Sequence, residues 1–164
     1  MRWIFLDRID ELVPGEHIRG VYTWPRSLQL FDDHFPKWPV VPGVLIMEAL
    51  AQLSGKAIGY TVRRERKYWP FPILSMMQKV KFRRFVSPDQ EVVLTAKFKA
   101  LRDESAVMMV RAYVDDVVMA QAEQVFVFNA VPFEDPADGK QLEAVEGAEL
   151  ARLWAGFEPD VWSA

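Results

Sequence analysis

The chain has 164 residues, 51% of them hydrophobic and 26% charged, and carries a formal net charge of −3 at pH 7. This length predicts one domain with an appendage, and the composition is typical of a folded globular protein. The acidic balance argues against a protein-wide nucleic-acid surface, and the lack of cysteine excludes disulfides, thiolate metal sites and cysteine nucleophiles.

The N-terminal segment predicts no signal peptide, because it is acidic from Asp7 onward and contains no long apolar run. No stretch approaches the roughly 18 consecutive apolar residues that a membrane span requires. We therefore expect a cytoplasmic protein without a membrane span. The two histidines, His17 and His34, are too few for a histidine-rich metal site, so we expect neither a metal nor a cofactor.

The first part of the chain predicts a strand and then an irregular loop. Pro14-Gly15 is a strong turn signal, and Glu16–Trp24, which follows it, favours a strand. Pro25–Pro39 is irregular and aromatic. His17 has polar neighbours after the turn, so we expect it on the surface.

A buried helix is predicted over Val44–Tyr60, because Pro42 occupies a typical first helical position and the segment after it is apolar on nearly every side. The exceptions are spaced by four, three and four residues, which places them on one helix face. They are Glu48, Gln52, Gly55 and Gly59. We expect the two glycines to serve packing between helix and sheet.

Four strands are predicted after a basic, aromatic loop over Arg63–Pro72. They cover Ile73–Val86, Glu91–Leu101, Ser105–Val114 and Val117–Phe128. The short connections between them predict an antiparallel meander. One long buried helix with such a meander predicts an α+β protein whose sheet curls around the helix.

The composition changes after residue 131. Pro132–Lys140 is rich in proline and acid and predicts a linker, and Gln141–Phe157 has an apolar stripe at helical spacing. We therefore divide the chain into a main domain, residues 1–131, and a C-terminal extension, residues 132–164. The aromatic end of the extension predicts that residues 141–162 dock on the main domain or on a neighbouring subunit.

The candidate chemistry lies in residues 33–52. His34, in a proline-restrained loop, is a candidate general base, and the unbonded amides around Gly43 form a donor site for an oxygen that gains negative charge. A carboxyl group among apolar side chains is favoured in its protonated form, so Glu48 is a candidate proton donor that Gln52 could hold in place. From the residues alone, a packed or capping His34 and a structural Glu48 remain alternatives.

Residues 34–52, HFPKWPVVPGVLIMEALAQ, resemble the signature of the 3-hydroxyacyl-[acyl-carrier-protein] dehydratases of fatty acid synthesis, in the FabZ branch. The shared pattern is His-Phe-Pro, a proline-valine step, Pro-Gly-Val-Leu, Glu-Ala and Ala-Gln. FLDRIDELVPGEHI and KVKFRRFVSPDQEV extend the resemblance, which covers roughly residues 3–130.

This resemblance implies a hot-dog fold, in which a curved antiparallel sheet wraps a long central helix. It also implies a homodimer with a continuous sheet, or a trimer of such dimers. In such dehydratases, His34 of one subunit would take the α-proton and Glu48 of the other would protonate the departing hydroxyl. The Gly43 amide would bind the thioester carbonyl. Glutamate at position 48, where the FabA branch has aspartate, implies dehydration without isomerisation.

The same resemblance implies acyl carrier protein, which is acidic, as the partner that brings the substrate. The candidate docking residues are Lys79, Lys81, Arg83 and Arg84. A second basic group is Arg63, Arg64, Arg66 and Lys67. The alternative for each of these residues is a solvated surface position.

The sequence also departs from the family pattern. Asp33 stands where the family usually has glycine and would favour a protonated His34, and Pro88-Asp89-Gln90 replaces the typical Pro-Gly-Asp. Residues 132–164 have no counterpart in short members. These departures suggest a dehydratase of a secondary lipid or polyketide route. A hot-dog acyl thioesterase and a non-catalytic hot-dog subunit that binds acyl carrier protein remain alternative hypotheses.

Overall fold

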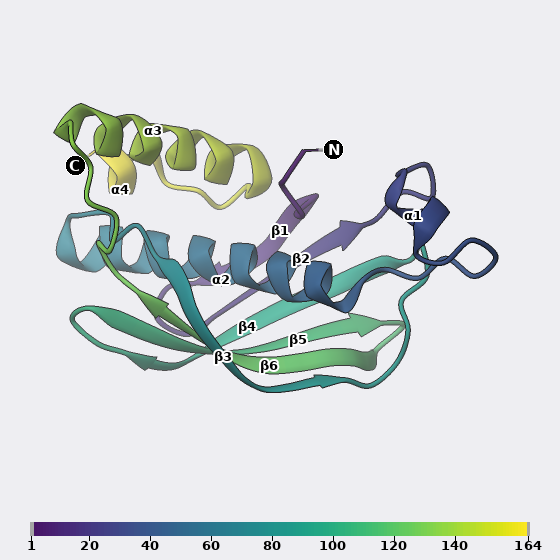
Figure 1. Ribbon diagram of the computed structural model, residues 1–164. Helices are drawn as coiled ribbons and strands as arrows, with labels where there is room; N and C mark the ends of the chain where they lie inside the picture. Colours follow the sequence, from purple (N-terminus) through teal and green to yellow (C-terminus); the bar gives the residue numbers. More distant parts are fainter. Residues whose placement is uncertain (1, 164) are drawn as a thin grey trace.

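One curved antiparallel sheet wraps around the long helix α2 in the computed structural model, which describes residues 2–163 (Figure 1). The strands are β1 (Arg8–Val13), β2 (His17–Thr23), β3 (Ile73–Phe82), β4 (Glu91–Leu101), β5 (Ser105–Val114) and β6 (Val117–Val127). The helices are α1 (Leu30–Asp33), α2 (Gly43–Arg66), α3 (Pro136–Leu153) and α4 (Pro159–Ser163). This architecture is the predicted α+β hot-dog fold.

The strand order is β1-β2-β4-β5-β6-β3, with every neighbouring pair antiparallel. Strands β4, β5 and β6 form the predicted meander, but β3 does not continue it. Instead β3 pairs with β6, from Ile73 opposite Val127 to Phe82 opposite Ala120. The lengths of the connections alone do not show whether β3 pairs with β4 or with β6. Because it pairs with β6, β3 is an edge strand of the sheet.

Helix α2 is longer than predicted. It begins at Gly43, directly after Pro42, and continues to Arg66, so only Lys67 onward belongs to the expected loop. Lys67 ends the helix in a left-handed conformation, with φ at 65°, and its amide donates to Arg63 O at 3.2 Å. The basic residues of the last turn lie at the negative end of the helix dipole, which favours this extension. Within residues 2–163, no helix combines the length and apolarity that a membrane crossing needs.

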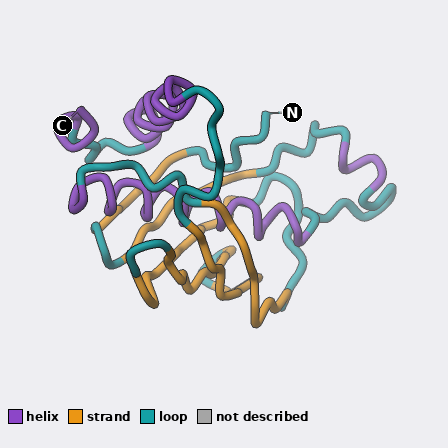
Figure 2. Tube along the Cα trace, turned by 60° about the vertical axis from the view of Figure 1, so that its left-hand side comes forward, coloured by secondary structure: helices purple, strands orange, loops and turns teal. Residues whose placement is uncertain are grey.

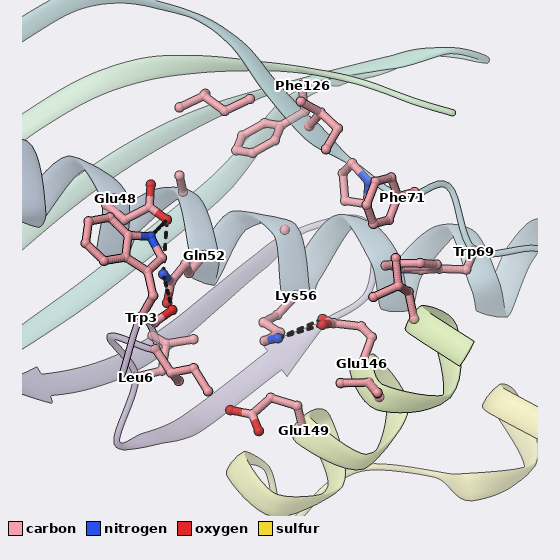
Figure 3. Close-up of a pocket in the computed structure, with 18 of the residues that line it drawn as sticks. Trp3, Leu6, Glu48, Gln52, Lys56, Trp69, Phe71, Phe126, Glu146 and Glu149 are labelled. Atoms are coloured by element: carbon pink, nitrogen blue, oxygen red, sulfur yellow. Dashed lines mark hydrogen bonds and ion pairs between the residues drawn. The ribbon is translucent and has the colours of Figure 1, made fainter. Parts of the chain in front are cut away.

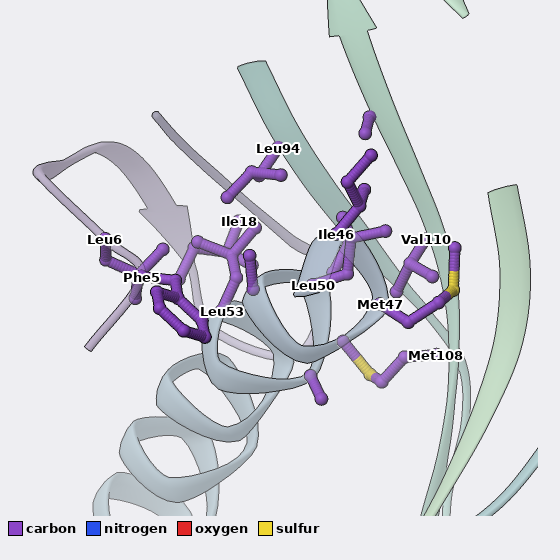
Figure 4. Packing of buried hydrophobic residues seen from close by; sticks show 14 of the residues in the cluster. Phe5, Leu6, Ile18, Ile46, Met47, Leu50, Leu53, Leu94, Met108 and Val110 are labelled. Atoms are coloured by element: carbon purple, nitrogen blue, oxygen red, sulfur yellow. The ribbon is translucent and has the colours of Figure 1, made fainter. Parts of the chain in front are cut away.

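The core lies between α2 and the concave face of the sheet (Figure 4). Leu50 and Leu53 of α2 are fully buried, as are Ile18 of β2, Leu94 of β4 and Met108 of β5. Burying each such side chain contributes about 1.5–3 kcal/mol. This packing fixes the rotation of α2 and therefore the direction in which its polar face points.

The C-terminal extension begins its helix earlier than predicted. Asp135 caps α3 by accepting a hydrogen bond from the Ala137 amide at 2.8 Å, and Pro136 occupies the first turn. The segment expected to link the two parts, Pro132–Lys140, is therefore helical from Pro136 onward. The prolines and acids that suggested a linker instead form the start of a helix.

The extension docks on the main domain, as predicted, and covers the side of α2 that faces away from the sheet (Figures 1 and 2). Lys56 of α2 binds both carboxylate oxygens of Glu146 at 2.8 Å. Arg63 contacts Glu143 at 2.9 Å and donates to Trp162 O at 2.8 Å. Helix α2 thus lies between the sheet on one side and α3 with α4 on the other.

Candidate active site

Glu48 lies in the second turn of α2 and is half-buried. Its Oε1 accepts two hydrogen bonds, one from the Trp3 indole Nε1 and one from Gln52 Nε2, both at 3.0 Å (Figure 3). No hydrogen bond from residues 2–163 reaches the second oxygen, Oε2. The carboxyl group is therefore held through one oxygen and presents the other to the cavity beside it.

Gln52 ties Glu48 to the N-terminal segment. Its Oε1 accepts from the Phe5 amide at 2.8 Å, and its Nε2 also donates to Trp3 O at 3.2 Å. Spacing by four residues places the two side chains on one helix face, as the sequence predicts. The sequence gives no signal for Trp3, because a segment without regular structure has no periodicity that would place it over α2.

His34 follows α1 and is half-buried, with its ring stacked on Phe35 at a centroid distance of 4.2 Å. Its Nδ1 lies 3.0 Å from Val40 O. When Nδ1 carries the proton it donates to this carbonyl, and Nε2 is then free to accept a proton. Asp33 is exposed and forms no ion pair with His34 in the described chain.

The structure does not bring His34 and Glu48 into one cavity of the same chain. The cavity beside Glu48 has a volume of about 740 Å³, and His34 does not line it. His17, the other histidine, is partly exposed and lies 3.3 Å from Glu11. A site that uses both His34 and Glu48 would therefore need a second subunit.

Gly43 lies at the start of α2, where the first intrahelical bonds run from Leu45 and Ile46 to Pro42 O. The amides of Gly43 and Val44 come before these bonds and point along the positive end of the helix dipole. A Cβ on Gly43 would lie 2.5 Å from a ring carbon of Phe82, so a side chain at position 43 would require that ring to move. The sequence did not indicate this close approach.

The polar face of α2 opens on the cavity and not on the sheet (Figure 3). Glu48, Gln52 and Gly55 line it, while a Cβ on Gly59 would lie 3.1 Å from the Trp69 indole nitrogen. The expectation that Gly55 and Gly59 pack the helix on the sheet is therefore wrong. A rotation of α2 that turned these glycines toward the sheet is excluded, because it would move the leucines of the helix out of the core.

The basic candidates lie on and after β3. Lys79, Lys81, Arg83 and Arg84 are all exposed. Lys79 lies 3.8 Å from Glu123, a buried carboxylate that also binds Lys99. Arg83 donates to Gln121 at 3.1 Å. In the second basic group, Arg63 is buried against the extension, so it holds α3 and is not part of an open surface.

Glu123 is a buried carboxylate of β6 that is surrounded by hydrogen-bond donors. Hydrogen bonds from Lys99 and from Gln78, the latter at 2.6 Å, hold the pKa of its carboxyl below the usual range. Among residues 2–163 there is no group of three or more His, Cys, Asp or Glu side chains that could hold a metal ion.

Comparison with known proteins identifies relatives of this chain. The model of the FabA-like domain matches residues 2–123. A protein of Streptococcus pyogenes named 3-hydroxyacyl-[acyl-carrier-protein] dehydratase FabZ is 37% identical over 123 residues, covering 75% of this chain and 86% of the relative. A protein of the same name from Listeria welshimeri is 29% identical over 130 residues, covering 79% and 88%.

Solved structures share the fold at low sequence identity. The dehydratase heterocomplex ApeI:P of Xenorhabdus doucetiae matches with a TM-score of 0.63 and 12% identity, covering 85% of this chain and 89% of that one. Zebrafish thioesterase superfamily member 2 matches with a TM-score of 0.58 and 13% identity, covering 74% and 80%. One fold therefore accommodates proteins with different names.

Proposed function

The chain belongs to the FabA-like domain family, with FabZ dehydratases among its relatives, and on this premise we propose that it converts 3-hydroxyacyl-[acyl-carrier-protein] to trans-2-enoyl-[acyl-carrier-protein]. The observation that carries the proposal is Glu48, whose carboxyl group is held through Oε1 and faces a cavity through Oε2. This is the arrangement that a proton donor to a leaving hydroxyl needs.

The reaction requires one base and one acid. His34 Nε2 removes the proton from the α-carbon, and the electron pair of that C–H bond forms the α,β double bond. The bond between the β-carbon and its hydroxyl breaks, and Glu48 supplies the proton that makes the hydroxyl leave as water. His34 then loses its proton and Glu48 regains one before the next turnover.

The hydrogen bonds around Glu48 support Oε2 as the oxygen that carries this proton. Both N–H donors, from Trp3 and Gln52, bind Oε1, so Oε1 acts as the carbonyl oxygen of the neutral acid. The hydroxyl group of the acid is then Oε2. Trp3 and Gln52 are positioning residues in this proposal, since they act on substrate only through Glu48.

The amides at the start of α2 supply the third element. Removal of the α-proton places negative charge on the thioester carbonyl oxygen, and the Gly43 N–H is available to hydrogen-bond it. The positive end of the α2 dipole favours the same charge. Because this donor belongs to the backbone of a packed helix, it does not have to reorganise during the reaction.

The active unit in this proposal is a homodimer, with His34 of one subunit beside Glu48 of the other. The edge strand β3 supports it, because its outer part exposes Met76 at 49%, Met77 at 43% and Phe82 at 55%. An exposed apolar edge of this kind is a surface for pairing with a second copy. Such pairing would also explain why His34 lies outside the Glu48 cavity.

The carrier partner in this proposal is acyl carrier protein, which docks on a basic rim. The rim consists of Lys79, Lys81, Arg83 and Arg84. Their positive charges complement an acidic partner and would speed its encounter with the site. The compartment in this proposal is the cytoplasm.

Water elimination from 3-hydroxybutyryl-[acyl-carrier-protein], followed by the absorbance of the enoyl product, tests the proposal. We expect turnover by the wild-type chain and almost none by Glu48→Gln. Release of free carrier thiol from the same substrate would identify a thioesterase instead. Binding of the carrier without either reaction would identify a non-catalytic subunit.

A further inference from the structure

Two apolar side chains of the extension remain exposed beside the candidate site. Leu142 and Val145 of α3 are 40% and 60% exposed, although Leu150 and Leu153 of the same helix are buried. Both exposed side chains line the cavity that contains Glu48. Apolar side chains gathered on the wall of a cavity are typical of a surface that a ligand covers.

The floor of this cavity is the polar face of α2. Gly55 lies seven residues beyond Glu48, which corresponds to about 10 Å along a helix. A Cβ on Gly55 would meet no atom within 4 Å, so the floor is open at this point. An extended chain that begins at Glu48 can therefore continue along the helix past Gln52.

The wall opposite the floor is apolar and aromatic (Figure 3). Trp69 and Phe71, from the loop before β3, and Phe126 of β6 contribute to it. The volume of about 740 Å³ lies within the range of pockets that enclose a small-molecule ligand. An apolar ligand chain in this cavity would be buried itself and would also cover the exposed side chains of Leu142 and Val145.

Lys56 and Glu146 fix the position of the outer wall. The pair joins α2 to α3 with both oxygens of Glu146 at 2.8 Å from Lys56 Nζ, and the side chains are only 12% and 21% exposed. Both residues line the cavity. A ligand chain that covered this ion pair would displace its remaining water, which costs free energy. We therefore expect the apolar chain to end before it reaches the pair.

We propose that the C-terminal extension forms the outer wall of an acyl-chain pocket, which selects 3-hydroxyacyl thioesters with an apolar chain longer than that of 3-hydroxybutyryl. The inference rests on the proposed function, because the reacting β-carbon at Glu48 is what places the chain in the cavity. The matched family model ends at residue 123, before the extension begins. The selectivity is thus a property of this chain's added segment.

Matched tryptophan substitutions on α3 test the proposal. Val145→Trp adds volume on the cavity side of the helix, while Ala148→Trp adds the same residue at an exposed position that does not line the cavity. The measured quantity is the ratio of kcat/KM for 3-hydroxydecanoyl-carrier to kcat/KM for 3-hydroxybutyryl-carrier. We expect Val145→Trp to lower this ratio at least about tenfold, the scale of a blocked apolar subsite, and Ala148→Trp to leave it unchanged.

Binding of decanoyl-pantetheine, a saturated thioester that cannot be dehydrated, gives a readout independent of catalysis. Val145→Trp should raise the Kd of decanoyl-pantetheine at least about tenfold. The Kd of butanoyl-pantetheine should change by no more than a factor of about two. Gly55→Leu, which fills the floor, should act in the same direction. Equal ratios and equal decanoyl affinity in Val145→Trp and Ala148→Trp would overturn the inference. A wild-type chain that binds decanoyl-pantetheine but eliminates no water would overturn the proposed function instead.

Discussion

The indole Nε1 of Trp3 donates a hydrogen bond of 3.0 Å to Oε1 of Glu48, across 45 positions of the sequence. The indole is 59% exposed, so this contact covers the carboxyl from the solvent side. It also explains how a segment without regular structure becomes part of the candidate site. The carboxyl group is oriented from two directions, by α2 through Gln52 and by the N-terminal segment through Trp3.

Trp3→Phe keeps an aromatic ring over Glu48 and removes only the N–H donor. We expect kcat to fall about three- to tenfold, the scale of one hydrogen bond of about 1 kcal/mol. Because Oε1 would lose one of its two donors, the basic limb of the kcat pH profile, along which the protonated acid is lost, should move as well. An unchanged profile with a lowered kcat would show that the indole acts through packing and not through the carboxyl.

His34→Ala and Glu48→Gln should each lower kcat for 3-hydroxybutyryl-carrier by at least about a hundredfold, as expected for a lost base or acid. Both side chains are only half-buried, so both variants should keep the thermal stability of the wild type. Circular dichroism melting provides the control. Near-normal turnover by either folded variant would remove that residue from the mechanism.

Mixing these two variants tests whether the site is shared. If His34 and Glu48 meet across a two-fold interface, a heterodimer contains one intact site and one doubly substituted site. An equal mixture with random pairing should then regain up to about a quarter of wild-type activity. Heterodimers that form, as shown by native mass spectrometry, and yet stay inactive would place the pair within one chain.

Reversal of the Lys56–Glu146 pair tests the docking of the extension. Lys56→Glu and Glu146→Lys each place like charges at a poorly exposed contact, so each should lower the free energy of unfolding by about 1–3 kcal/mol. The double variant restores opposite charges and should recover most of that loss in a double-mutant cycle. Additive losses would mean that the two side chains do not stabilise the extension through each other.

Glu123→Gln should destabilise the protein in a pH-dependent manner. Hydrogen bonds from Lys99 and Gln78 lower the pKa of Glu123 from 4.5, so the folded state favours its carboxylate. This contribution is present above pH 4.5 and is lost as the pH falls through the lower, folded pKa. The Tm difference from wild type should therefore be largest near pH 7 and shrink in acid. Glu134→Gln, at an exposed carboxylate, is the control and should show no such trend.

Local patterns in the sequence predicted the elements that hydrophobic periodicity defines. The apolar run around Leu50 and Leu53 indicated a buried helix, and helical spacing placed Glu48 and Gln52 side by side. Neither pairing of β3 with β6 nor contact of Trp3 with Glu48 could be predicted in this way. Both depend on how distant segments meet, which is decided by the packing of the whole core and not by local preference.

The start of α3 is a different case, because its signal was present in the sequence. Asp135 followed by Pro136 is a typical helix start, with a side-chain cap and a proline in the first turn. On composition alone, the acids and prolines around it predict a linker. Position-specific capping was thus more informative than average composition at this boundary.

The close approach of Phe82 to Gly43 has an evolutionary consequence. Because a Cβ at position 43 would lie 2.5 Å from the Phe82 ring, a substitution of Gly43 requires either that the ring turns away or that position 82 carries a smaller residue. A smaller residue at position 82 removes the clash without moving any other part of the chain. Homologous chains that carry alanine or serine at position 43 should therefore carry a smaller residue than phenylalanine at position 82, and the two positions should drift only as a pair.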